Sequence, residues 1–163
     1  EYNGREYQSY TKFGKMLYEM KYLNNPAIKK EIRESYINEI ISHFNGYIKY
    51  LKENYSNLNI TFIPSSSKIP DDITTKLSII NSIPLKTIIS KNSSISSKSM
   101  TNLSTQQFNK YSIDLSQSNS NDAFILIDDV IGTSASLCET MYKLYNFNKK
   151  VNFFFIPVKD VKS

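Results

Sequence analysis

The chain has 163 residues, an apolar fraction of 40% and a formal net charge of +5. We expect a single domain over residues 1–163, large enough to bury roughly two-thirds of the surface of its unfolded chain. The lone cysteine excludes an internal disulfide framework and a cysteine-rich zinc site, and it favours a cytoplasmic protein. No apolar run reaches the ~18 residues of a membrane span, so we expect no membrane contact. The positive charge is spread along the chain and supports nucleic-acid binding only weakly.

The first 55 residues predict helices. Apolar residues between positions 13 and 23 recur every three to four residues. A break at "LNNPAIKK" follows, and Pro26 is well placed as the first residue of a second helix. That helix has an apolar face extending over residues 28–51. His43 lies near this face, and we expect it to be packed or half-exposed rather than catalytic.

Two strands with a short helix between them are expected next. "LNITFI" (58–63) alternates like a strand and continues into the loop "PSSSKIPDD". The loop leads into the short helix, with Asp71 or Asp72 as its N-cap. "PLKTIIS" (84–90) predicts the second strand.

The composition changes after residue 90. The serine-rich stretch "SKNSSISSKSMTNLST" (90–105) cannot build a core and predicts a mobile loop, followed by a short helix around 103–110. "AFILI" (123–127) and "VNFFFIPV" (151–158) predict two further strands. A helix is expected between them, after residue 133. Its apolar face would carry Leu137, Met141, Leu144 and Tyr145.

Alternation of strands and helices indicates an α/β fold with a mostly parallel sheet flanked by helices. In such sheets ligands bind at the carboxyl ends of the strands. "PSSSK" (64–68) and "DDVIGTSAS" (128–136) both follow strands directly. These two loops are therefore the candidate site.

The second loop has the chemistry of a phosphate site. Residues 132–136 are all small and open a helix, so their backbone N–H groups can converge on one anion. Asp128 and Asp129 cannot face a phosphate, but they can accept hydrogen bonds from sugar hydroxyls attached to it. The pattern predicts a ribose 5-phosphate site.

Three other interpretations compete. A Walker B strand needs an upstream glycine-rich phosphate loop, and none of the other glycines (Gly4, Gly14 and Gly46) has that context. A phosphorylation-receiver domain carries its acidic pair near its first strand. Simple helix capping explains Thr133 or Ser134 but does not require two consecutive acids.

"FILIDDVIGTSAS" (124–136) resembles the phosphoribosyl pyrophosphate signature of type I phosphoribosyltransferases, which has four apolar residues, two acids, two apolar residues and Thr-Thr-Gly-x-Thr/Ser. Asp128 and Asp129 match the ribose-binding acids of that signature. Thr133 matches its second threonine and Ser136 its final hydroxyl. The resemblance implies that Gly132, Thr133, Ser134, Ala135 and Ser136 bind the 5′-phosphate.

The loop departs from the signature at two positions. Gly132 stands where threonine or aspartate is usual, and Ser134 stands where glycine is usual. Ser134 disfavours any positive-φ backbone that glycine would adopt freely. The missing acid at position 132 argues against an enzyme for 6-oxopurine bases.

Other segments are similar to the competence protein F branch of this family. They are "MKYLNNPAIKKEI" (20–32), "ITFIPSSSK" (60–68) and "STQQFNKYSI" (104–113). The last has Gln106 or Gln107 where the branch has arginine, and Asn109 where it has asparagine. The resemblance extends over roughly residues 13–158, and only the 124–136 motif is specific.

The resemblance implies a reaction in which a base nitrogen displaces pyrophosphate from C1 of phosphoribosyl pyrophosphate. The resemblance implies that Mg²⁺ enters with the substrate and needs few direct protein ligands, with Asp128 and Asp129 as the residues that could contact it. Ser65, Ser66 and Lys68 in the first loop would hold the pyrophosphate.

The 90–105 loop would act as a hood over the reaction, with Lys91 and Lys98 meeting the pyrophosphate. Cys138 is expected to pack rather than react. Two functions stay open: a transferase, and a non-catalytic sensor or scaffold in DNA uptake or defence.

Overall fold

The computed structural model describes residues 11–22, 26–92, 110–132, 134–147 and 150–159. Four helices and seven strands are assigned within these ranges. In chain order they are α1 (Lys12–Tyr22), α2 (Pro26–Asn54), β1 (Leu58–Phe62), α3 (Ile69–Asn81), β2 (Ile89–Lys91), β3 (Tyr111–Ile113), β4 (Ala123–Ile127), β5 (Val130–Ile131), α4 (Ala135–Asn146), β6 (Lys150–Phe155) and β7 (Val158–Lys159).

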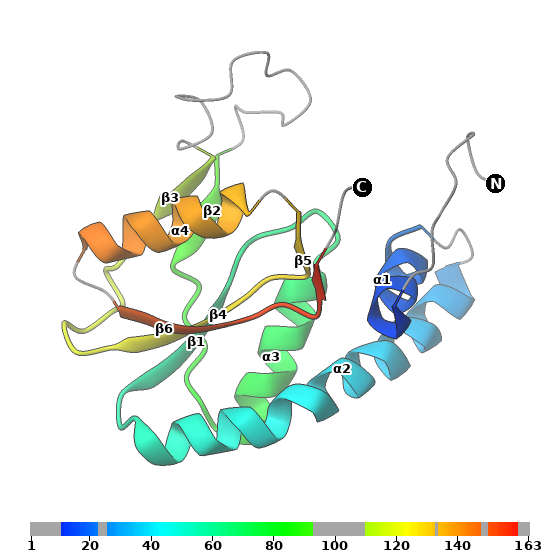
Figure 1. Cartoon of the computed structure of the whole chain (residues 1–163), viewed down its shortest axis with the longest axis horizontal. Coiled ribbons are helices and arrows are strands. Elements are labelled where there is room, and N and C mark those ends of the chain that lie inside the picture. Colours follow the sequence, from blue (N-terminus) through cyan, green and yellow to red (C-terminus); the bar gives the residue numbers. More distant parts are fainter. Residues whose placement is uncertain (1–10, 23–25, 93–109, 133, 148–149, 160–163) are drawn as a thin grey trace.

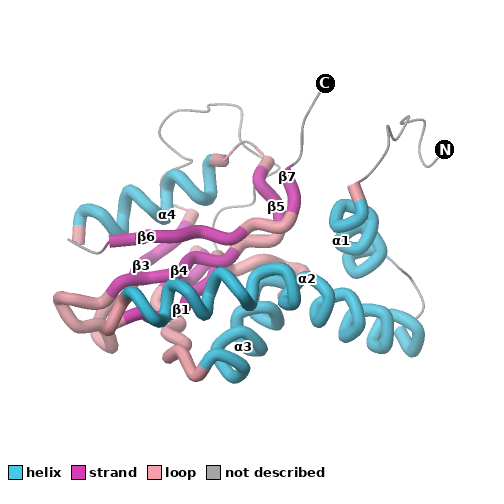
Figure 2. Tube along the Cα trace, turned by 60° about the horizontal axis from the view of Figure 1, so that its bottom comes forward, coloured by secondary structure: helices cyan, strands magenta, loops and turns pink. Residues whose placement is uncertain are grey.

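The central sheet is parallel and has the strand order β1-β4-β6. Helices α2 and α3 lie on one side of this sheet and α4 lies on the other (Figures 1 and 2). The predicted α/β fold with a mostly parallel sheet flanked by helices is therefore confirmed. The central strand β4 has the predicted bounds, 123–127.

Strand β4 is apolar throughout because both of its faces are buried. Ile125 and Ile127 pack in the cluster on the α2 and α3 side, whereas Phe124 and Leu126 pack in the cluster on the α4 side. All four side chains are fully buried. Burial of each stabilises the fold by roughly 1.5–3 kcal/mol before conformational entropy is counted. The strand therefore holds the two acids that follow it at a fixed place.

The N-terminal helices are fixed on the same core. Helix α2 begins at Pro26, as predicted. Met16, Leu17 and Met20 bury one side of α1, and the hydroxyl of Tyr36 on α2 donates a hydrogen bond to the Glu19 carboxylate. The N-terminal helical prediction is confirmed for the described residues, and α1 lies next to α2, beyond the carboxyl ends of the central strands (Figures 1 and 2).

His43 is exposed, and its ring meets the Phe13 ring edge-on at 5.0 Å between centroids. This contact belongs to the packing of α1 on α2. It agrees with a structural role for the histidine.

The predicted strand at 84–90 is largely wrong. Only Leu85 bridges to β1, opposite Ile60, and β2 begins at Ile89. Ile60 donates its N–H to the carbonyl of Pro84 and accepts from the N–H of Lys86, each over 2.9 Å. Pro84 has no N–H, so it cannot donate a hydrogen bond that would extend the pairing with β1 before Leu85.

Three smaller predictions also fail. The last strand is interrupted, because β6 ends at Phe155 and β7 takes up only Val158–Lys159. Tyr145 is 76% exposed, since it lies about 100° around α4 from the buried Leu144. Cys138 is exposed rather than packed. Its position on α4 turns it away from the sheet.

Most of the 90–105 loop and of the predicted helix at 103–110 lies outside the described residues, as does Lys98. The flanking residues form the antiparallel ribbon β2-β3, in which Lys91 pairs with Tyr111. Within the described part of the chain, no helix is long and apolar enough to cross a membrane.

Candidate functional site

Two loops meet at the carboxyl ends of adjacent strands. The 64–68 loop follows β1, and the 128–136 segment follows β4. The strands are still paired at this edge, where Ile63 donates its N–H to the carbonyl of Ile127 over 2.9 Å. Beyond them, the Ser67 hydroxyl donates to Oδ2 of Asp129 over 3.0 Å. The two predicted loops therefore lie side by side.

Both carboxylates of the acidic pair are buried. Asp128 is 8% exposed and Asp129 is 5% exposed. The backbone N–H of Asp129 donates to Oδ1 of Asp128 over 2.8 Å. The Lys21 ammonium, from the last turn of α1, lies 2.8 Å from Oδ2 of Asp129. A cation from the N-terminal helix therefore offsets the repulsion between the acids.

Burial raises the pKa of Asp128 to about 7. The negative charge of Asp129 adds to this rise, whereas the Asp129 N–H and the charges of Lys21 and Lys110 lower the pKa. Desolvation dominates because water cannot reach the carboxylate well enough to stabilise its charge. Near neutral pH, a proton on Asp128 is thus a second means of relieving the repulsion.

The loop before α4 has a strained backbone. Ser134 adopts φ 60° and ψ 0° at the N-cap and makes no capping hydrogen bond through its side chain. Ser134 therefore adopts the positive φ that serine disfavours, at the position where the resembled signature has glycine. A non-glycine residue in this conformation costs roughly 1–2 kcal/mol. Such strain occurs preferentially at ligand-binding sites.

The neighbouring loop residues are less constrained. Gly132 is exposed, with open space where a Cβ would lie. Ala135 is the first residue of α4 and is half-buried. Thr133, the other proposed cap, lies outside the described residues. The carbonyl of Ser134 accepts the N–H of Cys138 over 2.8 Å, which closes the first turn of the helix.

Ser136 lies among polar groups from the β2-β3 ribbon. Its hydroxyl accepts hydrogen bonds from the Lys110 ammonium over 3.3 Å and from the Tyr111 hydroxyl over 3.2 Å. The backbone N–H of Tyr111 donates to the buried Glu139 over 3.0 Å. Lys143 donates to the same Glu139 carboxylate over 2.7 Å. The end of the ribbon is thereby fixed against the first turns of α4.

The 64–68 loop is a tight turn. The N–H of Lys68 donates to the carbonyl of Ser65 over 3.1 Å, and the Ser65 and Ser67 hydroxyls lie 3.0 Å apart. Lys68 itself has a left-handed backbone, with φ 57°. Ser66 and Lys68 are exposed. Among the loop hydroxyls, Ser67 is therefore the one that reaches the acidic pair.

Arg33 of α2 holds this loop from behind. Its guanidinium donates to the carbonyl of Ser67 over 2.8 Å and to the carboxylate of Asp72 over 2.7 Å. The prediction of Asp71 or Asp72 as N-cap is wrong, because α3 begins at Ile69 with Lys68 as its N-cap. Both acids lie in the first turn of α3 instead, where their negative charges interact favourably with the positive end of the helix dipole.

The sequence prediction missed three residues that line the site: Lys21, Ser67 and Lys110. Ser67 belongs to the predicted loop, and Lys21 lies in the 20–32 segment of the resemblance. Lys110 lies in the 104–113 segment of the resemblance, but its approach to Ser136 depends on how the ribbon packs. Lys91, proposed to meet pyrophosphate, is exposed at the end of β2.

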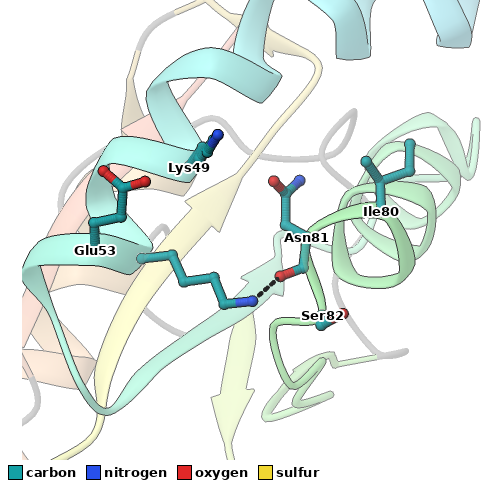
Figure 3. Close-up of a pocket in the computed structure, with 6 residues that line it drawn as sticks. Lys49, Glu53, Ile80, Asn81 and Ser82 are labelled. Carbon is teal, nitrogen blue, oxygen red and sulfur yellow. Dashed lines mark hydrogen bonds between the residues drawn. The ribbon is translucent and has the colours of Figure 1, made fainter.

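A surface hollow between α2 and α3 lies elsewhere (Figure 3). Its lining comes from the C-terminal ends of the two helices, where Lys52 donates to the carbonyl of Asn81 over 2.7 Å. These helix ends precede β1 and the Leu85 bridge, so the hollow lies near the amino ends of the strands. Ligands of parallel sheets bind at the opposite edge.

The described residues contain no group of three or more histidine, cysteine, aspartate or glutamate side chains that could hold a metal ion. The acidic pair offers hard carboxylate oxygens, although Oδ2 of Asp129 already accepts from Lys21 and Ser67. Mg²⁺ is usually held by one or two carboxylates together with substrate phosphates and water. The donors present fit a metal held mainly by the substrate.

Comparison with solved structures identifies the fold. A crystal structure of adenine phosphoribosyltransferase superimposes with a TM-score of 0.60 at 12% identity, over 78% of this chain and 71% of that one. The chain has the phosphoribosyltransferase fold. The adenine phosphoribosyltransferase of Saccharomyces cerevisiae, in complex with an imino-altritol bisphosphate and adenine, superimposes with a TM-score of 0.58 at 11% identity, over 85% and 72% of the two chains. No protein-family model and no curated protein sequence matches this chain.

Proposed function

We propose that this chain binds phosphoribosyl pyrophosphate or a nucleotide 5′-phosphate at the edge formed by residues 64–68 and 128–136. The observation that carries this proposal is the hydrogen bond of 3.0 Å between Ser67 and Asp129. It joins the proposed pyrophosphate loop to the proposed ribose acids. The phosphoribosyltransferase fold is the second support.

Each part of the site has a chemical role in this proposal. Asp128 and Asp129 accept hydrogen bonds from the ribose hydroxyls. The N–H groups of residues 132–136 and the hydroxyl of Ser136 bind the 5′-phosphate at the start of α4, where the helix dipole favours an anion. Ser65, Ser66 and Lys68 bind pyrophosphate on the other side of the acids. The ligand thus extends across the carboxyl ends of β1 and β4.

For a transferase, the bond between C1 and the pyrophosphate oxygen breaks while a bond from a base nitrogen to C1 forms. Pyrophosphate leaves with the electron pair, and the base nitrogen loses its proton to solvent. The chain contributes orientation and charge compensation rather than a covalent nucleophile. Mg²⁺, when bound with the substrate, would neutralise the leaving pyrophosphate, with Asp128 and Asp129 as the carboxylates within reach of it.

Calorimetry with phosphoribosyl pyrophosphate and Mg²⁺ tests the binding proposal. We expect saturable binding that Asp129→Asn weakens at least tenfold, about 1.4 kcal/mol. Glu53→Gln is the matched control, because Glu53 lies on α2 near the surface hollow and far from the two loops. Absence of binding to the unaltered chain would contradict the proposal.

A non-catalytic sensor or scaffold is the second candidate function. It is favoured by Gly132, which presents no side chain toward the ligand at the position where the resembled signature has threonine or aspartate. Release of pyrophosphate across a panel of purine and pyrimidine bases separates the two functions. Binding without release supports the sensor. The competence protein F branch is proposed on its three similar segments alone, and DNA uptake or defence is the setting that this branch suggests.

A further inference from the structure

Lys21 lies at the junction of the two site loops. Its ammonium is 2.8 Å from Oδ2 of Asp129, and the Ser67 hydroxyl donates to that same oxygen over 3.0 Å. One carboxylate oxygen, on a residue just after β4, therefore contacts a group from α1 and a group from the 64–68 loop. In the proposed function, the ribose and the pyrophosphate join at this junction.

The position of Lys21 is imposed by the packing of α1. Met20, the preceding residue, is 1% exposed, and Leu17, one turn earlier, is 2% exposed. Both belong to the core cluster that includes Ile125 and Ile127 of β4. Lys21 follows in the last turn of α1, where the helix dipole favours a cation.

The two partners of the ion pair differ in solvent access. The side chain of Asp129 is 7% exposed, whereas that of Lys21 is 25% exposed. Enclosing both partners of an ion pair removes the water that stabilises each charge, and their attraction often fails to compensate for that loss. Here the carboxylate is enclosed, and the lysine side chain stays partly open to solvent at the edge where the ligand is proposed to lie.

We infer that Lys21 acts as a built-in cation at the junction of ribose and pyrophosphate, so that binding of the phosphoribosyl ligand depends only weakly on a divalent metal. This inference rests on the proposed function. The fixed ammonium cancels the charge of the buried Asp129 carboxylate, so the pyrophosphate meets a neutral pair rather than an anion, which is part of what a divalent ion supplies. Lys21 is a binding and positioning residue in this role, and it forms no covalent bond to the ligand.

The test is calorimetry of phosphoribosyl pyrophosphate with the full chain, in EDTA and in saturating Mg²⁺. We expect the dissociation constant of the unaltered chain to differ less than tenfold between the two conditions. Lys21→Met is expected to weaken binding more than tenfold in EDTA and less than threefold in Mg²⁺, because the metal then replaces the lost cation.

Two variants serve as controls. Lys21→Arg keeps the charge and should restore most of the affinity that Lys21→Met loses in EDTA. Lys15→Met lies on the same helix, where Lys15 is 72% exposed and pairs only loosely with Glu19 at 3.9 Å, and it should leave both constants unchanged. If Lys21→Met does not fold, as judged by circular dichroism, the metal dependence of the unaltered chain decides the question by itself.

Two results would overturn the inference and leave the proposed function standing. One is binding of the unaltered chain only when Mg²⁺ is present. The other is an equal loss of affinity for Lys21→Met in both conditions, which would mean that Lys21 only supports the shape of the site. Failure of the unaltered chain to bind in either condition would instead reject the proposed function, and this inference with it.

Discussion

The hydroxyl of Ser67 lies 3.0 Å from the carboxylate of Asp129, although 62 residues separate them in the chain. The contact exists because β1 and β4 are adjacent and parallel, so the loops after both strands start at the same edge of the sheet. Arg33 fixes the loop from the other side by binding the Ser67 carbonyl over 2.8 Å. The geometry of the site thus depends on α2 as much as on the strands.

Replacing Ser67 with alanine should weaken ligand binding. The buried Asp129 carboxylate loses one of its donors, and hydrogen bonds to charged groups contribute about 1.5–3 kcal/mol. We expect roughly a tenfold or larger rise in the dissociation constant for phosphoribosyl pyrophosphate, measured by calorimetry. Ser56→Ala is the matched control, because Ser56 is exposed in the turn before β1, at the opposite end of that strand from the site. Equal effects of the two variants would contradict the role assigned to Ser67.

The raised pKa of Asp128 predicts an unusual pH dependence of stability. The folded chain holds this proton up to pH about 7, whereas the ordinary pKa of 3.8 governs the unfolded chain. Between these values the folded state binds more protons, so the free energy of unfolding falls as the pH rises. The fall contributed by this group amounts to a few kcal/mol, at about 1.36 kcal/mol for each pH unit between the two pKa values.

Asp128→Asn removes that titration while keeping an oxygen that can accept the Asp129 N–H. Urea denaturation at pH 5 and pH 8 should therefore show a variant that gains stability over the unaltered chain mainly at pH 8. The exposed Glu53→Gln should leave the pH profile unchanged. A stability difference for Asp128→Asn that is the same at both pH values would argue against a buried, neutral Asp128.

The left-handed backbone of Ser134 predicts that Ser134→Gly stabilises the fold. Glycine adopts φ 60° without the steric cost that serine bears, so we expect a gain of about 1 kcal/mol in the free energy of unfolding. Ala135→Gly, at the first position of α4, is the contrasting variant and should lose roughly 0.5–1 kcal/mol, because glycine is a poor helix former. Thermal denaturation followed by circular dichroism measures both. A loss of stability in Ser134→Gly would show that the serine side chain has a structural role.

The ion pair between Lys86 and Asp122 should stabilise the sheet on the side away from the site. The two charged atoms lie 2.8 Å apart, and both side chains are largely buried. Burial raises the pKa of Asp122, but the hydrogen bond and charge of Lys86, with donors from Asn119 and Ser118, outweigh it and hold the pKa below the ordinary value. A depressed pKa means that this stability is present at neutral pH and is lost as the pH falls below about 4.

Asp122→Ala should cost roughly 1.5–3 kcal/mol at pH 7, because the largely buried Lys86 ammonium then keeps only the carbonyl of Gln117 as an acceptor. Lys86→Met together with Asp122→Leu should recover much of that loss. Urea denaturation of Lys86→Met, of Asp122→Leu and of the double variant gives the coupling energy. An additive result would mean that the two side chains do not stabilise each other.

The sequence by itself determined the elements that depend on local pattern. Strand β4 and the start of α2 at Pro26 have their predicted positions, because an apolar run and a proline after a break are local signals. The acidic pair at the end of β4 was also evident, since two adjacent acids after a buried strand need a compensating partner.

Tertiary structure alone decided which groups provide that compensation. Lys21 and Ser67 approach Asp129 through the packing of α1 on the core and the pairing of β1 with β4, and neither arrangement is encoded within a few residues of the acids. Lys110 reaches Ser136 for the same reason, through the ribbon that packs on α4. The backbone of Ser134 is likewise set by the surrounding loop and helix, which outweigh the preference of serine for negative φ. The local sequence thus predicted where the acids lie, and long-range packing determined which side chains contact them.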